Sequence, residues 1–169
     1  LFSVLNNSKN RLLRNIVLFA IHTGMRLGEI LNLTWDNINF ENRLIILFPE
    51  QTKNGKRHLI PMNKVVYKIL KEEESLKVSG CPYVFHRNGR KVKSIRDGFR
   101  NALRKAKIED FRFHDLRHTF ASRLVQKGID LYVVKELLNH SSVTITERYA
   151  HLRLENMRKA VEILEKEFD

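Results

Sequence analysis

Residues 114–142 read HDLRHTFASRLVQKGIDLYVVKELLNHSS, and this stretch decides which fold the sequence predicts. It predicts one helix over 114–127 that Gly128 closes, because glycine readily adopts the left-handed conformation that ends helices. It also predicts a second helix that begins at Asp130, a residue that caps first turns, and ends at Leu138. The stretch therefore indicates two helices joined by a short turn.

The helical pattern continues on both sides of this pair. Near the N-terminus, Leu12, Ile16 and Phe19 recur at the spacing that places them on one helix face. Asn63 and Ser94 are residue types that cap helix N-termini. The further expected helices cover residues 10–22, 26–33, 63–77, 94–107, about 142–148 and 152–168.

A small sheet is expected between residues 37 and 60. Glu41-Asn42 reads as a turn, and Thr52-Lys53-Asn54-Gly55 contains Asn-Gly, the strongest short hairpin signal. The expected strands cover residues 37–40, 43–48 and 58–60. The sequence therefore predicts a mainly α fold with a small three-stranded antiparallel β-sheet, in a single domain.

Length and composition exclude several classes of protein. With 169 residues, 43% of them hydrophobic, the chain is neither disordered nor of low complexity. Its longest apolar run, Ile16–Ile21, is far shorter than the roughly 20 residues that span a bilayer, and no secretion signal opens it, so we expect a cytoplasmic protein. The lone Cys81 has no second cysteine for a disulfide or a zinc site. Because the chain begins at Leu1 and not at Met, we expect it to be part of a longer protein.

The charge is strongly positive and concentrated. The chain carries 31 Lys and Arg against 19 Asp and Glu, a formal net charge of +12. Residues 86–107 contain nine Lys and Arg but only one acid, Asp97. Such a patch favours a polyanion, and double-stranded DNA is the expected partner. Within the helix over 94–107, we expect Arg96, Arg100 and Arg104 to contact the DNA backbone.

Four segments together are typical of one kind of site. They are Thr23-Gly24-Met25-Arg26-Leu27-Gly28-Glu29, Thr52-Lys53-Asn54-Gly55-Lys56, His114-Asp115-Leu116-Arg117-His118-Thr119-Phe120, and Leu138-Asn139-His140 followed by Tyr149. In these segments, and in their order, the chain resembles the tyrosine recombinases, the family of phage integrases and Xer-type recombinases. The resemblance covers nearly the whole chain and implies that residues 1–169 form the catalytic domain, without the amino-terminal core-binding domain that family members carry.

The resemblance also implies roles for individual residues. Tyr149 would be the nucleophile, and Lys53 would be the acid that protonates the leaving 5′ oxygen. Arg26 and Arg117 would clamp the phosphate, while His114 would accept the tyrosine proton and His140 would hydrogen-bond the phosphate. The catalytic residues expected from the sequence are thus Tyr149, Arg26, Lys53, His114, Arg117 and His140.

These residue types suit the chemistry. Attack on a phosphodiester builds negative charge at a five-coordinate phosphorus, and the planar arginine fork binds phosphate in a bidentate manner. Arg117 lies three residues after His114, so both project from one helix face. The expected function is site-specific cleavage and rejoining of DNA through a 3′-phosphotyrosyl link, with no metal, nucleotide or other cofactor. Two alternatives stay open: a DNA-binding module without catalysis on the same fold, and relaxation of DNA like that of type IB topoisomerases.

Each assignment has a structural alternative. Arg26 could simply pair with Glu29, and His140 could interact only with a helix end. Lys56 shares the turn with Lys53 and could be the acid instead. The position of the lysine in the family's hairpin favours Lys53. His118 is expected to support the site without taking part in catalysis.

Two further features bear on the site. His114 and His118 have the spacing of the zinc-protease motif, but no third ligand follows and Arg117 would place a cation beside the metal. The family usually has glycine where this chain has Asn139, a residue that also tolerates positive φ. We therefore disfavour the metalloprotease and retain the recombinase.

The final helix carries a narrow apolar seam. Its members are Leu154, Met157, Val161, Leu164 and Phe168, at alternating steps of three and four. The seam fits docking on the chain's own core, and it equally fits packing into a neighbouring protomer, as the family resemblance implies. We expect self-assembly into a tetrameric synapse on DNA, through the helix over 152–168.

Overall fold

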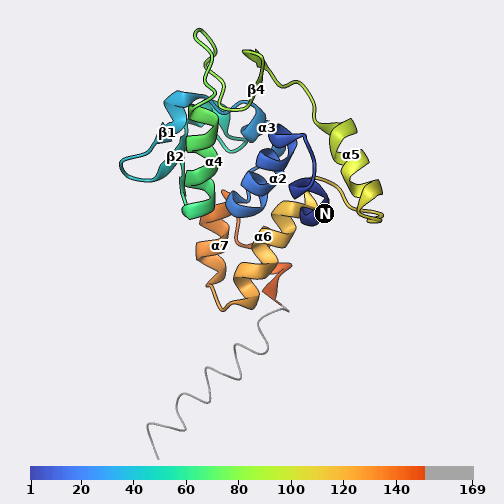
Figure 1. The fold of residues 1–169 in the computed structure, drawn as a ribbon. Helices are drawn as coiled ribbons and strands as arrows, with labels where there is room; N and C mark the ends of the chain where they lie inside the picture. The colour runs from blue at the N-terminus through green and yellow to red at the C-terminus, as the bar shows by residue number, and fades with distance from the viewer. Residues whose placement is uncertain (151–169) are drawn as a thin grey trace, which may run out of the picture.

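The computed structural model describes residues 1–150 and is mainly helical (Figure 1). Its helices are α1 (Phe2–Asn6), α2 (Arg11–Thr23), α3 (Leu27–Leu31), α4 (Lys64–Glu74), α5 (Arg96–Lys105), α6 (Asp115–Gln126), α7 (Leu131–Leu138) and α8 (Thr144–Glu147), with 3-10 turns η1 (Trp35–Asn37) and η2 (Pro49–Gln51). Its strands are β1 (Ile38–Asn39), β2 (Leu44–Leu47), β3 (His58–Pro61), β4 (His86–Arg87) and β5 (Arg90–Lys91). The predicted fold class is confirmed. Within residues 1–150, no helix is both long and apolar enough to cross a bilayer.

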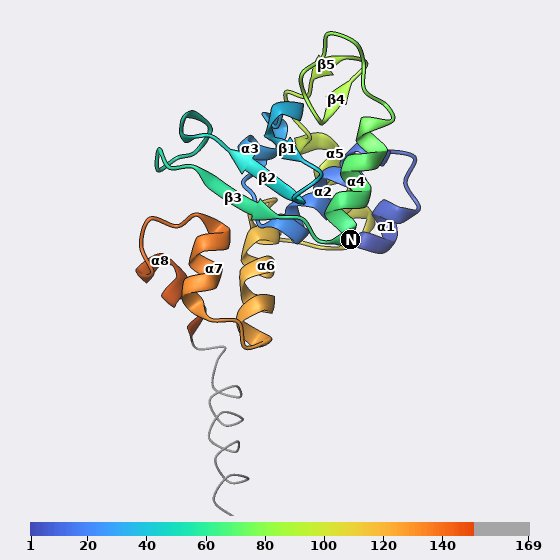
Figure 2. The same ribbon diagram turned by 90° about the vertical axis from the view of Figure 1, so that its left-hand side faces the viewer.

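The helical pair that the sequence predicted is present as α6 and α7. Gly128 adopts φ 85°, and the Asp130 carboxylate accepts a hydrogen bond from the backbone N–H of Tyr132 at 2.7 Å. The glycine lets the chain reverse between the helices, and the aspartate satisfies a donor that the first turn leaves without a helical partner. The two helices therefore lie side by side below the sheet (Figure 2).

The predicted three-stranded sheet has the order β1-β2-β3, and both pairings are antiparallel. Ile45 pairs with Ile60, and both are buried. The β2–β3 connection is longer than a tight hairpin, because Gln51 closes the turn η2 by accepting hydrogen bonds from Phe48 N at 3.0 Å and Asn37 Nδ2 at 2.7 Å. The predicted turn follows at its tip, where Gly55 has φ 65°.

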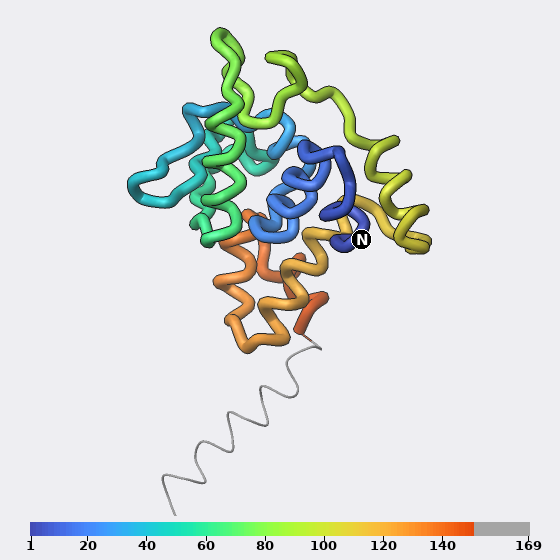
Figure 3. The backbone as a smooth tube through the Cα atoms, viewed as in Figure 1, coloured from blue at the N-terminus to red at the C-terminus, as the bar shows by residue number. Residues whose placement is uncertain are grey.

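Three other segments differ from the prediction. The basic helix α5 begins at Arg96 and not at Ser94, although the Ser94 hydroxyl accepts from Arg96 N at 3.1 Å, and it ends before Lys107, which has φ 53°. The helix α1 and the hairpin of β4 and β5 were not predicted. Figure 3 shows the backbone passing from α4 through residues 75–95 to α5. The helix α5 and the sheet lie on opposite sides of α2. The predicted helix over 152–168 lies outside the described residues.

The buried apolar side chains form two clusters. The larger one joins α2, the sheet, α4 and α5, and the smaller one joins α6, α7 and the segment that carries Tyr149. Leu116 belongs to the first cluster and Ala121 to the second, so α6 passes from one to the other. This part of α6 therefore lies at the junction of the clusters.

Gly24 permits the close approach at this junction. It ends α2 in the left-handed conformation, with φ 67°. A Cβ atom at this position would lie 2.6 Å from Phe120 Cδ1 on α6 and 3.0 Å from Leu138 Cδ2 on α7. Both the backbone conformation and the packing therefore require glycine.

We expect Gly24→Ala to lower the free energy of unfolding by about 2–4 kcal/mol, because the left-handed conformation and the displacement of Phe120 both cost energy. Thermal unfolding measures this loss, because each kcal/mol lowers the unfolding midpoint by about 2–4 °C in a chain of this size. Gly28→Ala is the matched control, since a Cβ on Gly28 of α3 meets nothing within 4 Å. Alanine there should leave the midpoint unchanged or raise it slightly. Equal losses in the two variants would contradict this account of Gly24.

Candidate active site

One cavity of about 430 Å³ collects all six residues that the sequence singled out as catalytic. Its lining residues are Arg26, Lys53, Asn54, His114, Arg117, His118, Asn139, His140, Ser141, Ile145, Arg148 and Tyr149. They come from the α2–α3 turn, the β2–β3 connection, α6 and the chain from α7 to α8. Within residues 1–150 the lining contains no carboxylate, so the cavity is electropositive.

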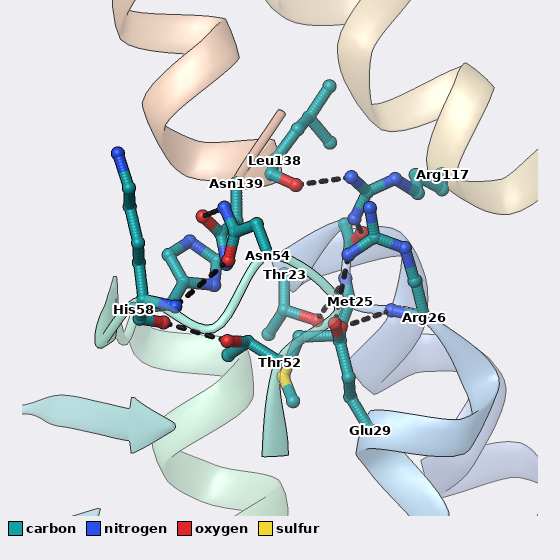
Figure 4. Close-up of polar contacts among 12 residues, drawn as sticks. Thr23, Met25, Arg26, Glu29, Thr52, Asn54, His58, Arg117, Leu138 and Asn139 are labelled. Atoms are coloured by element: carbon teal, nitrogen blue, oxygen red, sulfur yellow. Dashed lines mark hydrogen bonds and ion pairs between the residues drawn. The ribbon is translucent and has the colours of Figure 1, made fainter. Parts of the chain in front are cut away.

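Arg117 on α6 is the most constrained of these side chains. It is only 4% exposed, and its guanidinium donates to the carbonyl of Gly24 at 2.6 Å and to the carbonyl of Leu138 (Figure 4). These carbonyls lie at the C-terminal ends of α2 and α7, which carry partial negative charge. Burial lowers the pKa of Arg117 to about 10, so the group is still a cation at neutral pH. Two of its five N–H donors are used on the carbonyls, and Arg117 also lines the cavity.

Arg26 provides the second arginine. It precedes α3, where its backbone N–H donates to Glu29 Oε2 at 2.8 Å and its Nη1 to Glu29 Oε1 at 2.9 Å. The structural alternative from the sequence, pairing with Glu29, is therefore present. Arg26 nevertheless lines the cavity, where its guanidinium lies beside that of Arg117 (Figure 4).

Tyr149 follows α8 and is buried in the smaller apolar cluster. Its hydroxyl lies 2.5 Å from Nδ1 of His118. Burial raises the pKa of Tyr149 and outweighs the opposing effect of Arg148 and Arg117, so the phenol is protonated at neutral pH. The contact differs from the expectation from the sequence, in which His114 accepts the proton of the tyrosine hydroxyl. The segment after α8 brings the hydroxyl to the second turn of α6, one turn beyond His114.

The three histidines of the cavity are all shifted toward the neutral form. Burial is the first cause for each, and the pKa of His140 falls to about 4 because Arg117 and Arg26 add to the effect of burial. His114 and His118 meet edge to face, with ring centroids 4.8 Å apart. His140 Nδ1 lies 2.9 Å from the Thr146 hydroxyl, so its side chain holds α8 and does not cap α7.

Lys53 enters the cavity from the tip of the β2–β3 connection and is exposed. The neighbouring Asn54 forms a reciprocal amide pair with Asn139: Asn54 Nδ2 donates to Asn139 Oδ1 at 2.6 Å, and Asn139 Nδ2 donates to Asn54 Oδ1 at 3.2 Å. The pair joins the connection to the end of α7 (Figure 4).

The structure does not place the predicted DNA-backbone residues in this cavity. Arg96, Arg100 and Arg104 are exposed on α5, which lies apart from the lining elements, and Arg100 pairs with Asp97 at 2.6 Å. Phe99, Ala102 and Leu103 bury the opposite face of the helix. The three arginines thus form a separate basic surface.

Sequence reasoning missed several lining residues. Arg148 had a signal, a cation directly before the predicted nucleophile, and Asn54 stood in one of the four segments without a role of its own, whereas Ser141 and Ile145 had no signal. The zinc-protease alternative gains no support, because within residues 1–150 no group of three His, Cys, Asp or Glu side chains is placed to hold a metal ion.

Comparisons with known proteins agree with this geometry. The catalytic domain of bacteriophage HP1 integrase superposes with a TM-score of 0.71 at 30% identity, covering 95% of this chain and 87% of that one. The integrase of Salmonella phage P22 is 36% identical over 83% of this chain and 39% of its own length. Tyrosine recombinase XerA of Pyrococcus furiosus is 32% identical over 88% of this chain and 53% of its own length.

The chain thus spans about 39% and 53% of the length of these two sequence relatives. The family model described as the phage integrase family matches residues 1–156. That match covers most of the chain and includes the four segments whose residues meet in the cavity, and the chain belongs to the phage integrase family.

Proposed function

We propose that this chain cleaves and rejoins DNA at defined sites, with Tyr149 as the nucleophile. The observation that carries the proposal is the cavity itself. Tyr149 shares it with three arginines and a lysine, and no carboxylate of the described chain lines it. Such a donor set fits a phosphodiester, whose negative charge grows during attack. The names of the relatives, integrase and recombinase, support the same reaction.

The chemistry follows from the positions of the side chains. The phenol oxygen attacks phosphorus, the bond to the 5′ oxygen breaks, and the 3′ phosphate is left on Tyr149. Arg117 and Arg26 stabilise the five-coordinate phosphorus, because their charges are fixed before the substrate arrives. His140 is neutral in the free site and can hydrogen-bond a phosphate oxygen. A 5′ hydroxyl from the same or another strand reverses the step, so the bond energy is retained.

Two protons have to move during cleavage. The phenol proton passes to His118, the ring that already contacts the hydroxyl, while His114 lies beside His118. The leaving 5′ oxygen takes its proton from the Lys53 ammonium at the tip of the β2–β3 connection. Both groups act in the opposite sense when the strand is rejoined.

The defined site and the assembly on DNA belong to the same proposal. We take residues 1–169 as one catalytic domain that acts in a tetrameric synapse, because strand exchange needs two cleaved duplexes. The apolar seam of residues 152–168 would supply contacts between protomers. Exchange between two duplexes is the outcome that separates this function from simple relaxation by a topoisomerase.

We expect the chain to form a covalent adduct with DNA that survives denaturant and forms in the presence of EDTA. The measurement is a gel assay on supercoiled plasmid and nicked duplexes that carry genomic sites of the source organism. Tyr149→Phe should abolish the adduct while leaving stability nearly unchanged, because the substitution removes only the hydroxyl and its bond to His118. Tyr132→Phe is the matched control, since this tyrosine is 66% exposed on α7.

Three outcomes would overturn the proposal in different ways. An adduct that needs a divalent metal would replace the tyrosine mechanism with a metal-dependent one. An adduct that persists in Tyr149→Phe would point to another nucleophile. Relaxation of any plasmid without site preference or strand exchange would favour the topoisomerase-like alternative.

The pH dependence of cleavage identifies the proton acceptor. Because the pKa of His118 is lowered by burial and by Arg148, its neutral form persists below the usual histidine range. At subsaturating DNA, where rates report the ionisation of the free protein, we expect a level rate through the ordinary histidine range and a fall only at more acidic pH. His118→Gln should slow cleavage on the order of 100-fold and remove the acidic fall.

His114→Gln is the control for this assignment, because the two rings are neighbours on one helix face. It should retain the acidic fall if His118 is the acceptor. If instead His114→Gln removes the fall and His118→Gln keeps it, the proton passes to His114, as the sequence alone suggested.

We propose that the exposed arginines of α5 contact the DNA backbone away from the cleavage site. Replacing Arg96, Arg100 and Arg104 by Glu should weaken DNA binding and reduce the slope of log affinity against log salt by about 0.9 for each phosphate that the protein no longer neutralises. Glu substitutions at Lys9, Lys68 and Lys77, which lie outside α5, change the net charge equally. An equal loss of affinity in both triple variants would show that only net charge matters.

A further inference from the structure

Lys53 is carried by a segment that the sheet alone does not fix. The connection between β2 and β3 covers residues 48–57, and its turn η2 near the start is held by Gln51. Beyond η2, the local bonds at the tip include Gly55 N to Thr52 O at 3.3 Å, the Thr52 hydroxyl to Lys56 O at 2.8 Å, and Lys56 N to Asn54 Oδ1 at 3.2 Å. Lys53 itself makes no hydrogen bond or ion pair within residues 1–150. These contacts shape the tip but do not place it over the cavity.

The amide pair of Asn54 and Asn139 provides that placement. Its two hydrogen bonds, 2.6 and 3.2 Å long, join residues that are 85 positions apart in the sequence. Asn139 can take part because it ends α7 in the left-handed conformation, with φ 49° and ψ 48°, which directs its side chain away from the helix. Glycine would keep this backbone at least as well but would offer no amide.

The end of α7 is a fixed point in the molecule. Arg117 donates to the Leu138 carbonyl, and His58 Nε2 lies 3.0 Å from the Glu136 carbonyl. His58 is buried at the start of β3, so it ties the base of the connection to the same helix end that Asn54 contacts at the tip. Lys53 is therefore held between two contacts to one helix end, which also leads directly into His140.

We propose that Asn139 is a positioning residue, which acts through Asn54 to hold Lys53 over the scissile phosphate. This inference rests on the proposed function. Two neutral hydrogen bonds at a partly exposed position stabilise a contact only modestly, so the tip exchanges between a docked and a released state. Only the docked state presents the ammonium to the leaving oxygen.

The first test needs no DNA. In Asn139→Gly the turn at the tip stays intact, whereas Asn54→Ala would also remove the acceptor for Lys56 N at 3.2 Å. We expect trypsin to cut after Lys53 several times faster in Asn139→Gly than in the wild type, with unchanged thermal stability and an unchanged rate after Lys91 in the β4–β5 hairpin. Asn88→Gly is the matched control, because Asn88 is an exposed asparagine with φ 52°. Equal rates after Lys53 in the wild type and Asn139→Gly would overturn the docking.

The second test measures cleavage at the site mapped by adduct formation. One substrate has the normal 5′ oxygen, and the other has sulfur in its place, since a thiolate leaves without a proton. We expect Asn139→Gly to cleave the oxygen substrate on the order of tenfold more slowly than the wild type and the sulfur substrate at nearly the same rate. Lys53→Ala should show the same pattern with a larger loss.

The outcomes distinguish a failure of the amide pair from a failure of the proposed function. One outcome is that Asn139→Gly cleaves both substrates more slowly by the same factor, while Lys53→Ala cleaves the sulfur substrate at nearly the wild-type rate. In that case the amide pair does not act through the lysine, and the inference fails. If Lys53→Ala does not recover on sulfur, the proposed role of Lys53 is wrong. A wild type that cleaves neither substrate overturns the proposed function itself, while the protease result still tests the docking.

Discussion

The structure depends on one buried charge. Arg117 is enclosed between the C-terminal ends of α2 and α7, and it donates to a carbonyl of each. Burying an unpaired cation is costly, and within residues 1–150 no carboxylate pairs with this one. The partial negative charge of two helix ends offsets much of that cost, and the remaining positive field is directed at the cavity. The same arrangement that holds the helices together therefore leaves a buried cation at the cavity, as the proposed contact with phosphate requires.

The same contact explains why the active site lies where it does. The two apolar clusters meet along α6, and Gly24 allows α2 to approach closely enough for its carbonyl to reach Arg117. Arg26 follows Gly24 by two residues, and His140 follows Leu138 by two. Each helix end that binds Arg117 therefore delivers another side chain to the cavity. Packing of the two clusters and assembly of the site therefore depend on the same contacts.

The sequence predicts the parts of this site better than the contacts between them. Arg26, His114, Arg117, His140 and Tyr149 stand in local motifs, and helices α2, α4, α6 and α7 follow from periodicity and capping residues such as Asn63 and Asp130. The contact of His118 with Tyr149 joins residues 31 apart, and that of Asn54 with Asn139 joins residues 85 apart. Such pairs arise from how α7 and α8 pack on α6 and on the sheet, which no local pattern contains. The turn η2 was missed although it is local: Pro49 begins it, and Gln51 N donates to the Phe48 carbonyl at 2.9 Å.

Fixed and adjustable groups are divided in a way that suits a reversible reaction. In the proposed reaction, the groups that bind phosphate would have to hold their geometry during both cleavage and rejoining, and Arg117 is buried and bonded to backbone. The group proposed to protonate the leaving oxygen would have to give way when that oxygen departs or returns, and Lys53 lies on an exposed connection held by side-chain amides. Tyr149 lies between these extremes, since its ring is packed in the smaller cluster while its hydroxyl remains in the cavity. Backbone hydrogen bonds thus hold the buried charge, and weaker side-chain contacts hold the connection that carries the proposed proton donor.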